Sequence, residues 1–210
     1  MRIARLVAAL AAPLLLASCL LSPGRFVSTL DIRKDRSFTF TYVGEALAAE
    51  TNMSDGKGGP KKPQPVSAED AAQYRQVAEA LAREQGYRAV EYVGGRTFRV
   101  DYQLTGTLDR GFSFPINLDA MALIPWVAAE VRKDGSVRIK APAFGDMTQG
   151  APGPQAPSNV DGREGTFTLT TDATLVMQNN EEGAAAGPPA RVVWKVTPTS
   201  KTVPTAVVRF

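Results

Sequence analysis

The sequence predicts an α+β fold: a mostly antiparallel β-sheet with one main helix, over about residues 68–85, packed on one face. Three observations support this class. Runs with an apolar residue at every second position recur along the chain, and two turn pairs that contain glycine, Gly94-Gly95 and Asp134-Gly135, each separate two of them. One segment has helical spacing instead. Because a sheet and a helix each have one apolar face, packing one on the other is the economical architecture.

The first two strands are expected at residues 26–32 and 37–43. In the second, Phe38, Phe40 and Tyr42 alternate with threonines, which is typical of a strand with one buried face. A short polar segment separates the two runs, so we expect a hairpin.

The helix is bounded by recognisable end signals. Ser67 is a suitable N-cap with Asp70 three positions later, and Gly86 is a suitable C-terminal stop. Between them, four apolar residues at helical spacing form one face: Tyr74, Val77, Ala78 and Leu81. We expect this face to pack against the sheet.

Two further hairpins are marked by their turns. Gly94-Gly95 separates residues 87–93 from 97–108, and Asp134-Gly135 separates 127–132 from 136–140. Later strands are expected at 166–171, 174–176, 191–196 and 205–210. Two other apolar segments, 111–116 and 121–126, have no clear period.

Two segments are poor in apolar residues and rich in Gly, Pro and polar residues, near 52–66 and 142–165. We expect both to be mobile loops within a single domain that spans residues 19–210.

The N-terminus has the composition of a signal peptide. Arg2 and Arg5 precede twelve apolar residues, Leu6 to Ala17, too few to span a bilayer. The next residues complete Leu16-Ala17-Ser18-Cys19, which resembles the lipobox of bacterial lipoproteins. The resemblance implies that residues 1–18 are removed and that Cys19 carries lipid. The alternative is an ordinary signal peptide followed by an unrelated cysteine.

Lipid on Cys19 would anchor the protein to a membrane, because two or more acyl chains hold a protein stably. In Gram-negative lipoproteins an Asp after the cysteine commonly retains the protein in the inner membrane, whereas this sequence has Leu20. The resemblance therefore favours the periplasmic face of the outer membrane of the cell envelope.

Composition argues against several classes of function. The chain has no histidine, and its one cysteine is the expected lipidation site, so nucleophilic triads and His-containing metal sites have no residues to use. Without residues 1–18, 22 Lys plus Arg face 21 Asp plus Glu, which gives no basic surface for nucleic acid. We expect no enzyme activity, cofactor or metal.

Carboxylates alone can hydrolyse glycosides, so a hydrolase is still an alternative. The acids Asp101, Asp109, Asp119, Glu130, Asp146 and Asp172 have no spacing that predicts a pair. Asp172 is the first to examine, although a turn residue is the simpler interpretation. The run 179–182 is interpreted as a solvated turn rather than a calcium loop.

Aromatic residues are the candidates for a binding surface. Trp126 follows Ile124-Pro125 in an irregular apolar segment, and with Phe112 and Phe114 it is the candidate for contacts with a ligand. Trp194 lies in an alternating strand and is expected in the core.

Residues 26–32 with 37–42, and residues 191–198, together with the lipobox, resemble uncharacterised proteobacterial lipoproteins and, more distantly, LppM-type lipoproteins of actinobacteria. The distant family implies a glycolipid-binding α/β domain, although this sequence lacks that family's C-terminal transmembrane helix.

Three functions follow from these observations. The first is a membrane-anchored, non-catalytic binding module for lipid, glycolipid or an envelope component, with an apolar groove between helix and sheet. The second is a structural or assembly accessory that pairs with a protein partner through an exposed strand edge. The third is the carboxylate-only hydrolase, which requires two converging acids with at least one raised pKa.

Overall fold

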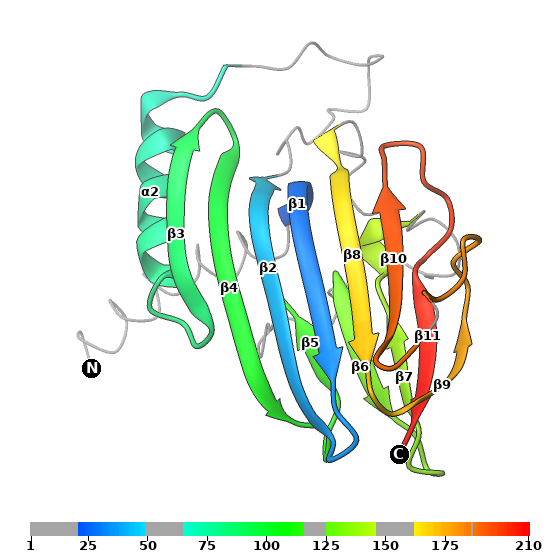
Figure 1. Cartoon of the computed structure of the whole chain (residues 1–210). Coiled ribbons are helices and arrows are strands. Elements are labelled where there is room, and N and C mark those ends of the chain that lie inside the picture. Colours follow the sequence, from blue (N-terminus) through cyan, green and yellow to red (C-terminus); the bar gives the residue numbers. More distant parts are fainter. Residues whose placement is uncertain (1–20, 49–64, 116–124, 146–161, 186) are drawn as a thin grey trace, which may run out of the picture.

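The computed structural model describes residues 21–48, 65–115, 125–145, 162–185 and 187–210. These residues form eleven strands, one α-helix and one short 3-10 helix. The α+β class is confirmed, but the strands form two sheets rather than one (Figure 1).

The larger sheet has six strands in the order β10-β8-β1-β2-β4-β3. Most neighbours are antiparallel, but β1 and β8 are parallel, so the sheet is mixed. Its strands are β1 (Leu21–Ile32), β2 (Ser37–Ala48), β3 (Tyr87–Gly94), β4 (Thr97–Thr107), β8 (Glu164–Thr171) and β10 (Ala190–Val196).

The smaller sheet has five antiparallel strands in the order β5-β6-β7-β11-β9. They are β5 (Phe112–Phe114), β6 (Val127–Val131), β7 (Val137–Lys140), β9 (Thr174–Gln178) and β11 (Thr205–Arg209). The 3-10 helix η1 (Pro142–Phe144) follows β7.

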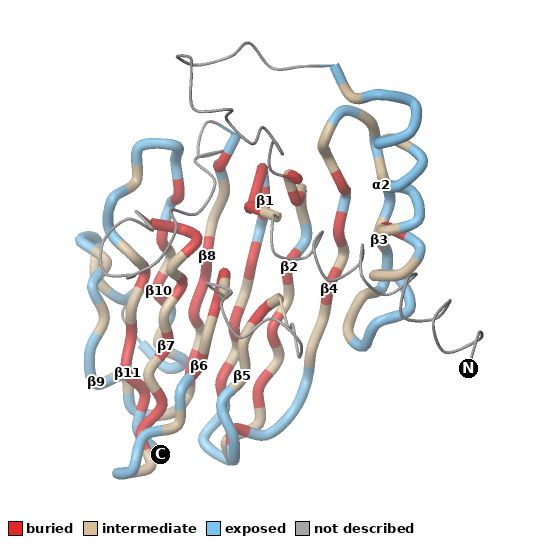
Figure 2. Tube along the Cα trace, turned by 180° about the vertical axis from the view of Figure 1, so that it is seen from behind, coloured by how far each residue is buried: buried red, intermediate tan, exposed pale blue. Residues whose placement is uncertain are grey.

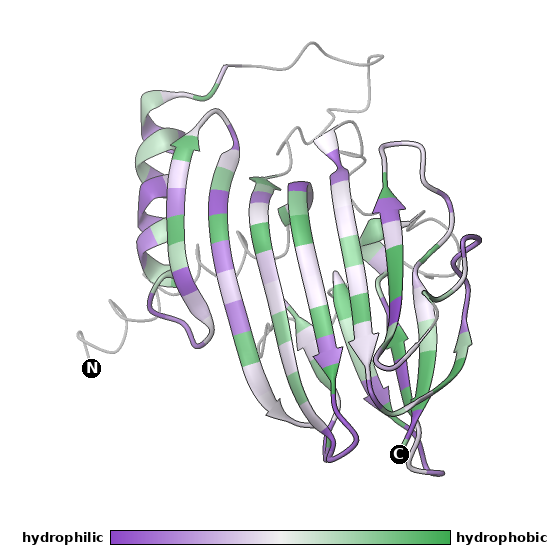
Figure 3. Cartoon of the chain, in the orientation of Figure 1, coloured by the Kyte–Doolittle hydropathy of each residue, from purple (hydrophilic) through white to green (hydrophobic). Residues whose placement is uncertain are grey.

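The smaller sheet and the helix α2 (Ala68–Leu81) cover the same face of the larger sheet, side by side (Figures 1 and 2). Two residues of β4 show this, because side chains at alternate positions of a strand share one face. Phe98 contacts Tyr74 of the helix, and Tyr102 contacts Phe114 of β5. Figure 3 shows the corresponding alternation of hydropathy along the strands.

Helix α2 begins as expected, since the Ser67 hydroxyl accepts a hydrogen bond of 3.0 Å from the Asp70 backbone N–H. It ends at Leu81, four residues before the expected end at 85. The chain must turn there to enter β3, and Gly86 makes the turn with φ of +91°. A Cβ at Gly86 would lie 2.6 Å from the Tyr102 ring.

A row of large side chains crosses the larger sheet at one level. Cross-strand pairing aligns six residues, one on each strand: Tyr87, Tyr102, Tyr42, Ser28, Phe167 and Trp194. Five of the six are aromatic. Rings of the covering layer, Phe114, Trp126 and Phe144, pack on this row with centroid separations of 4.5 to 5.7 Å. The core therefore lies between the two layers.

Phe26 fills the place on β1 that the small Ser28 leaves open. Its ring stacks on Phe144 at 4.3 Å. Both cross-strand partners of Phe26 are glycines, Gly44 on β2 and Gly165 on β8. A Cβ on either would lie 2.2 to 2.4 Å from a backbone oxygen of Phe26 or its neighbour Arg25. The close approach of three strands at Phe26 therefore requires glycine.

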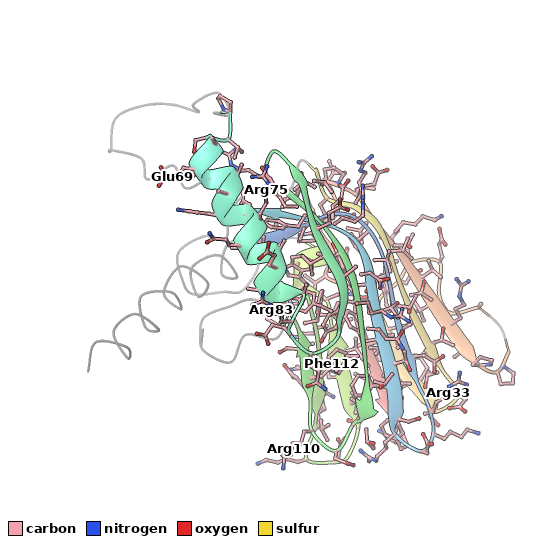
Figure 4. The ribbon with its side chains drawn as sticks, turned by 90° about the vertical axis from the view of Figure 1, so that its left-hand side faces the viewer. Arg33, Glu69, Arg75, Arg83, Arg110 and Phe112 are labelled. Carbon is pink, nitrogen blue, oxygen red and sulfur yellow. The ribbon has the colours of Figure 1, made fainter. Side chains whose placement is uncertain are left out.

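The two sheets form a sandwich, and Arg36 connects their turns at the end opposite the start of β1. The backbone of Arg36 has φ of +69°. Its guanidinium donates to the Gly135 and Leu108 carbonyls and lies 4.5 Å from the Phe210 ring centroid. Figure 4 shows Arg33 and Arg110 near this end. The turns of both sheets are thus connected to one side chain.

All three expected hairpins are present, with Gly94, Gly95 and Gly135 at positive φ in their turns. The apolar segment at 111–116 contributes β5, whose three residues are too few to show a period.

The expected mobile loops are only partly described. Residues 52–64 and 146–161 lie outside the described residues, as does the expected signal peptide. The ends of the second loop differ from the expectation. Residues 142–144 form η1, with Ala143 and Phe144 buried, and β8 begins at Glu164. These ends are held by core contacts that composition does not show.

Among the described residues, no helix has the length and apolar character needed to cross a bilayer.

Gly165→Ala should lower the free energy of unfolding by at least about 2 kcal/mol, because the new methyl group would overlap the Phe26 backbone. Chemical denaturation measures the loss. Gly106→Ala in β4 is the control, since its Cβ would meet the edge of the Phe38 ring at 3.0 Å. Equal losses in the two variants would show that the close packing at Phe26 is not a constraint.

Candidate binding cleft

Two adjoining depressions lie on the side of the sandwich formed by β9, β10 and β11. They have volumes of about 280 Å³ and about 500 Å³ and share Asn179, Lys201 and Thr202. The first is lined by the β9–β10 turn, the face of β10 and the connection from β10 to β11. The second is lined by the end of β7, Pro142 and the residues before β11. We call the two together the lateral cleft.

Asn179 lies where the two depressions meet and lines both of them. Its Oδ1 accepts hydrogen bonds from the Trp194 indole N–H at 3.1 Å and from the Thr205 backbone N–H at 2.8 Å. Its Nδ2 donates to the Val203 carbonyl at 2.8 Å. One amide side chain thus joins β10 of the larger sheet to β11 of the smaller.

Arg163 closes the wall on the side of η1. Its guanidinium is buried and donates to the carbonyls of Ala143, Gly145 and Ser200. These bonds connect η1, the start of β8 and the β10–β11 connection. The wall is therefore part of the folded framework.

Three lysines and two glutamates line the cleft, and both glutamates, Glu181 and Glu182, belong to the first depression. Lys195 forms an exposed ion pair with Glu182 at 3.2 Å, which contributes little to stability. Lys140 and Lys201 line the second depression, and no carboxylate of the described residues pairs with either. The arrangement can hold an anionic group, since two ammonium groups are open to a ligand.

The cleft lies toward the end of the sandwich where β1 starts. Val196, the last residue of β10, pairs with Gly165, which pairs in turn with Phe26, the sixth of the twelve residues of β1. The β10–β11 connection continues from there toward the same end, as Figure 1 shows.

The aromatic residues expected at a binding surface lie in the core instead. Trp126 is 5% exposed and Phe114 is 2% exposed, and their rings pack on each other and on Tyr42. The Trp126 indole N–H donates to the Leu21 carbonyl at 3.3 Å. Phe112 is half-buried and stacks on Phe38 at 4.7 Å. Inter-sheet packing, which the sequence pattern does not show, covers these side chains.

The acids considered for hydrolysis are dispersed. Asp172 accepts a hydrogen bond of 2.7 Å from the Lys34 backbone N–H, so it joins two turns. Asp101 lies 3.8 Å from Arg88, and Glu130 pairs with Arg138. Asp119 and Asp146 lie outside the described residues. The described residues contain no cluster of three or more His, Cys, Asp or Glu side chains able to hold a metal ion.

Carboxyl groups with shifted pKa values shift in the direction that favours the charged form. A hydrogen bond from Arg25 lowers the pKa of Glu45, and hydrogen bonds from Ser37 and Ser136 lower the pKa of Asp35 and Asp134. Each shift runs opposite to the raised pKa that a general acid requires, so these three groups give the hydrolase interpretation no support.

Cys19 and Leu20 lie outside the described residues. Among the described residues, β1 begins at Leu21, which pairs with Ala48 in the first register position of β1 and β2. Ser22, Pro23 and Gly24 are buried. One residue, Leu20, therefore separates Cys19 from the sheet.

Comparison with known proteins gives little further information. No family model matches the chain, and no curated protein matches it. Among solved structures, the chain is distantly similar to the folded domain of LppM from Mycobacterium tuberculosis, with 16% identity over 90% of this chain and 91% of that chain. The TM-score is 0.35, which is too low to support an argument.

The cleft residues Lys140, Asn179 and Lys201 were not found by sequence analysis. They are far apart in the sequence and belong to no motif. The signal that was available, the run of polar residues at 179–182, was interpreted as a solvated turn, and the structure does place a turn at Glu181 and Glu182.

Trp126→Ala should lower the free energy of unfolding by about 3 to 5 kcal/mol, as truncation of a buried aromatic residue does. Phe112→Ala is the matched control and should cost less, because its ring is half-buried. Thermal and denaturant unfolding measure both. A neutral Trp126→Ala variant would mean that this ring is not part of the core and would return it to the candidates for a binding surface.

Proposed function

We propose that this chain is a lipid-anchored protein of the bacterial envelope whose folded part is a non-catalytic binding module for a lipid, a glycolipid or another envelope component. The observation that carries the proposal is Leu16-Ala17-Ser18-Cys19, placed after a basic and then an apolar stretch and followed two residues later by the first strand. Cys19 would carry the lipid, and the membrane would be the first partner.

The position of the cleft supports the binding role. With Cys19 two residues before β1, the start of β1 lies within about 7 Å of the anchored residue, because an extended chain spans at most about 3.5 Å per residue. The lateral cleft contains Lys140 and Lys201 and is lined by the β10–β11 connection, which runs toward this end in Figure 1. An anionic headgroup or an acidic glycolipid at the membrane surface is therefore the ligand that we propose.

The residue after the cysteine supports the outer membrane as the location. Leu20 stands where an Asp would commonly retain a lipoprotein in the inner membrane, and the proposed site is the periplasmic face of the outer membrane.

The anchor is tested by Cys19→Ala. Wild-type protein should be cut before Cys19, gain the mass of its acyl chains and partition into detergent. The variant should stay uncut and unmodified, as intact-mass measurement of the envelope fraction shows. Wild-type protein without acyl chains would contradict the anchor.

The location is tested by separating the inner and outer membrane fractions. Leu20→Asp should move the protein from outer to inner membrane fractions, whereas the control Leu20→Ala should not. A wild-type protein in the inner membrane would contradict the location without affecting the anchor.

The cleft is tested by native mass spectrometry of residues 19–210 with Cys19→Ser, incubated with phosphatidylglycerol or phosphatidylcholine. We expect phosphatidylglycerol to be retained. Lys140→Ala with Lys201→Ala should reduce its occupancy about tenfold or more, since each charged hydrogen bond contributes roughly 1.5 to 3 kcal/mol.

Lys34→Ala with Lys133→Ala removes two exposed lysines from the opposite end and is the matched control. A mass without bound lipid after incubation, or equal losses in the two double variants, would contradict an anionic-lipid site in the lateral cleft.

A further inference from the structure

Strand β9 is an edge strand that carries neither a charged residue nor a proline. It pairs with β11 on one side, and the described residues contain no strand on its other side. Figure 2 shows β9 exposed along most of its length at the margin of the sandwich. An unpaired edge presents backbone N–H and C=O groups that can template another strand.

The four edge strands of the described residues differ in how they are protected. β3 carries Arg88 and Glu91, β10 carries Arg191 and Lys195, and β5 has three residues. Charge and short length both discourage pairing with another chain. The sequence of β9, Thr-Leu-Val-Met-Gln, has no charge and no proline.

Two neighbouring side chains of β9 are apolar and exposed. Val176 is 46% exposed and Met177 is 43% exposed. A register shift opposite Val207 and Val208 places Val176 in a bulge, which leaves its side chain outside the regular alternation. Adjacent apolar groups and free backbone groups are the two contacts that an added strand would use.

We propose that β9 is the binding site for an extended, uncharged segment of a different protein, which adds to the smaller sheet as a sixth strand. Backbone hydrogen bonds to β9 would supply the affinity, and apolar side chains of the segment would cover Val176 and Met177. The choice of a different protein rather than a second copy rests on the proposed lipid anchor.

The argument against a second copy is geometric. β8 is parallel to β1, and the turn at Asp172 and Ala173 sends β9 back toward the end where β1 starts. A symmetric pair of β9 strands is antiparallel, because the two-fold axis reverses the strand direction. The two anchors would then lie at opposite ends of the dimer. Two copies on one membrane surface cannot pair in this way.

The test uses the full lipidated chain in detergent micelles and a capped hexapeptide of alternating threonine and valine. At saturating peptide, hydrogen exchange of the β9 amides should slow about tenfold or more, because they would enter a ladder. The same peptide with alternate N-methyl groups cannot complete the ladder and should have no effect. Slowing by both peptides, or by neither, would overturn the proposal.

Two variants distinguish peptide binding at the β9 edge from nonspecific binding to exposed apolar side chains. Val176→Lys should abolish the peptide effect, since a charge on an edge discourages strand addition. Val43→Lys is the control: Val43 is 50% exposed, but β2 is paired on both sides. An equal loss in the two variants, or a peptide effect at β3 or β10 as large as at β9, would overturn the proposal.

The second-copy outcome has its own measurement. Analytical ultracentrifugation of the full chain without peptide should show one chain per micelle. A dimer that Val176→Lys converts to monomer would identify a second copy as the occupant and overturn the choice of a different protein. The peptide effect does not require lipid on Cys19, so failure of the anchor and failure of the β9 site are separate results.

Discussion

The packing of aromatic rings between the two sheets is the interaction on which the other features depend. Each strand of the larger sheet contributes one residue to a single transverse row, and the rings of β5, η1 and the residue before β6 pack on it. The constraint is tightest at Phe26, where two glycines allow β2 and β8 to approach β1. Burial in this core raises the pKa of the Tyr42 and Tyr87 hydroxyls above the ordinary value for tyrosine.

The lateral cleft is a consequence of this packing. Phe144 stacks on Phe26 and packs against Phe167, which fixes η1 against the larger sheet and places Lys140 and Pro142 beside the start of β11. Asn179 and Arg163 then join the two layers by hydrogen bonds to the connections between them. The lysines of the cleft thus extend from a wall whose position is set by the core.

Local features of the structure could be predicted from sequence, and long-range ones could not. Gly94-Gly95 and Asp134-Gly135 specify turns by themselves, so their hairpins follow from a few adjacent residues. The parallel pairing of Val27 with Thr166 has no local signature, and without it the second sheet cannot be inferred. For the same reason Trp126 was expected at a surface. Trp126 packs on Tyr42 of the larger sheet, whose strands come from segments between Leu21 and Val196.

The short distance between Cys19 and β1 has a consequence that a longer tether would not have. A lipid on Cys19 would hold the start of β1 at the membrane surface. Strands β1 and β8 would run away from that surface, and β9 would run back toward it. The lateral cleft would then lie near the headgroups, while β9 would face the space beside the domain. Since the cleft and the edge of β9 meet at Asn179 but use different groups, a lipid and a protein segment could be bound together.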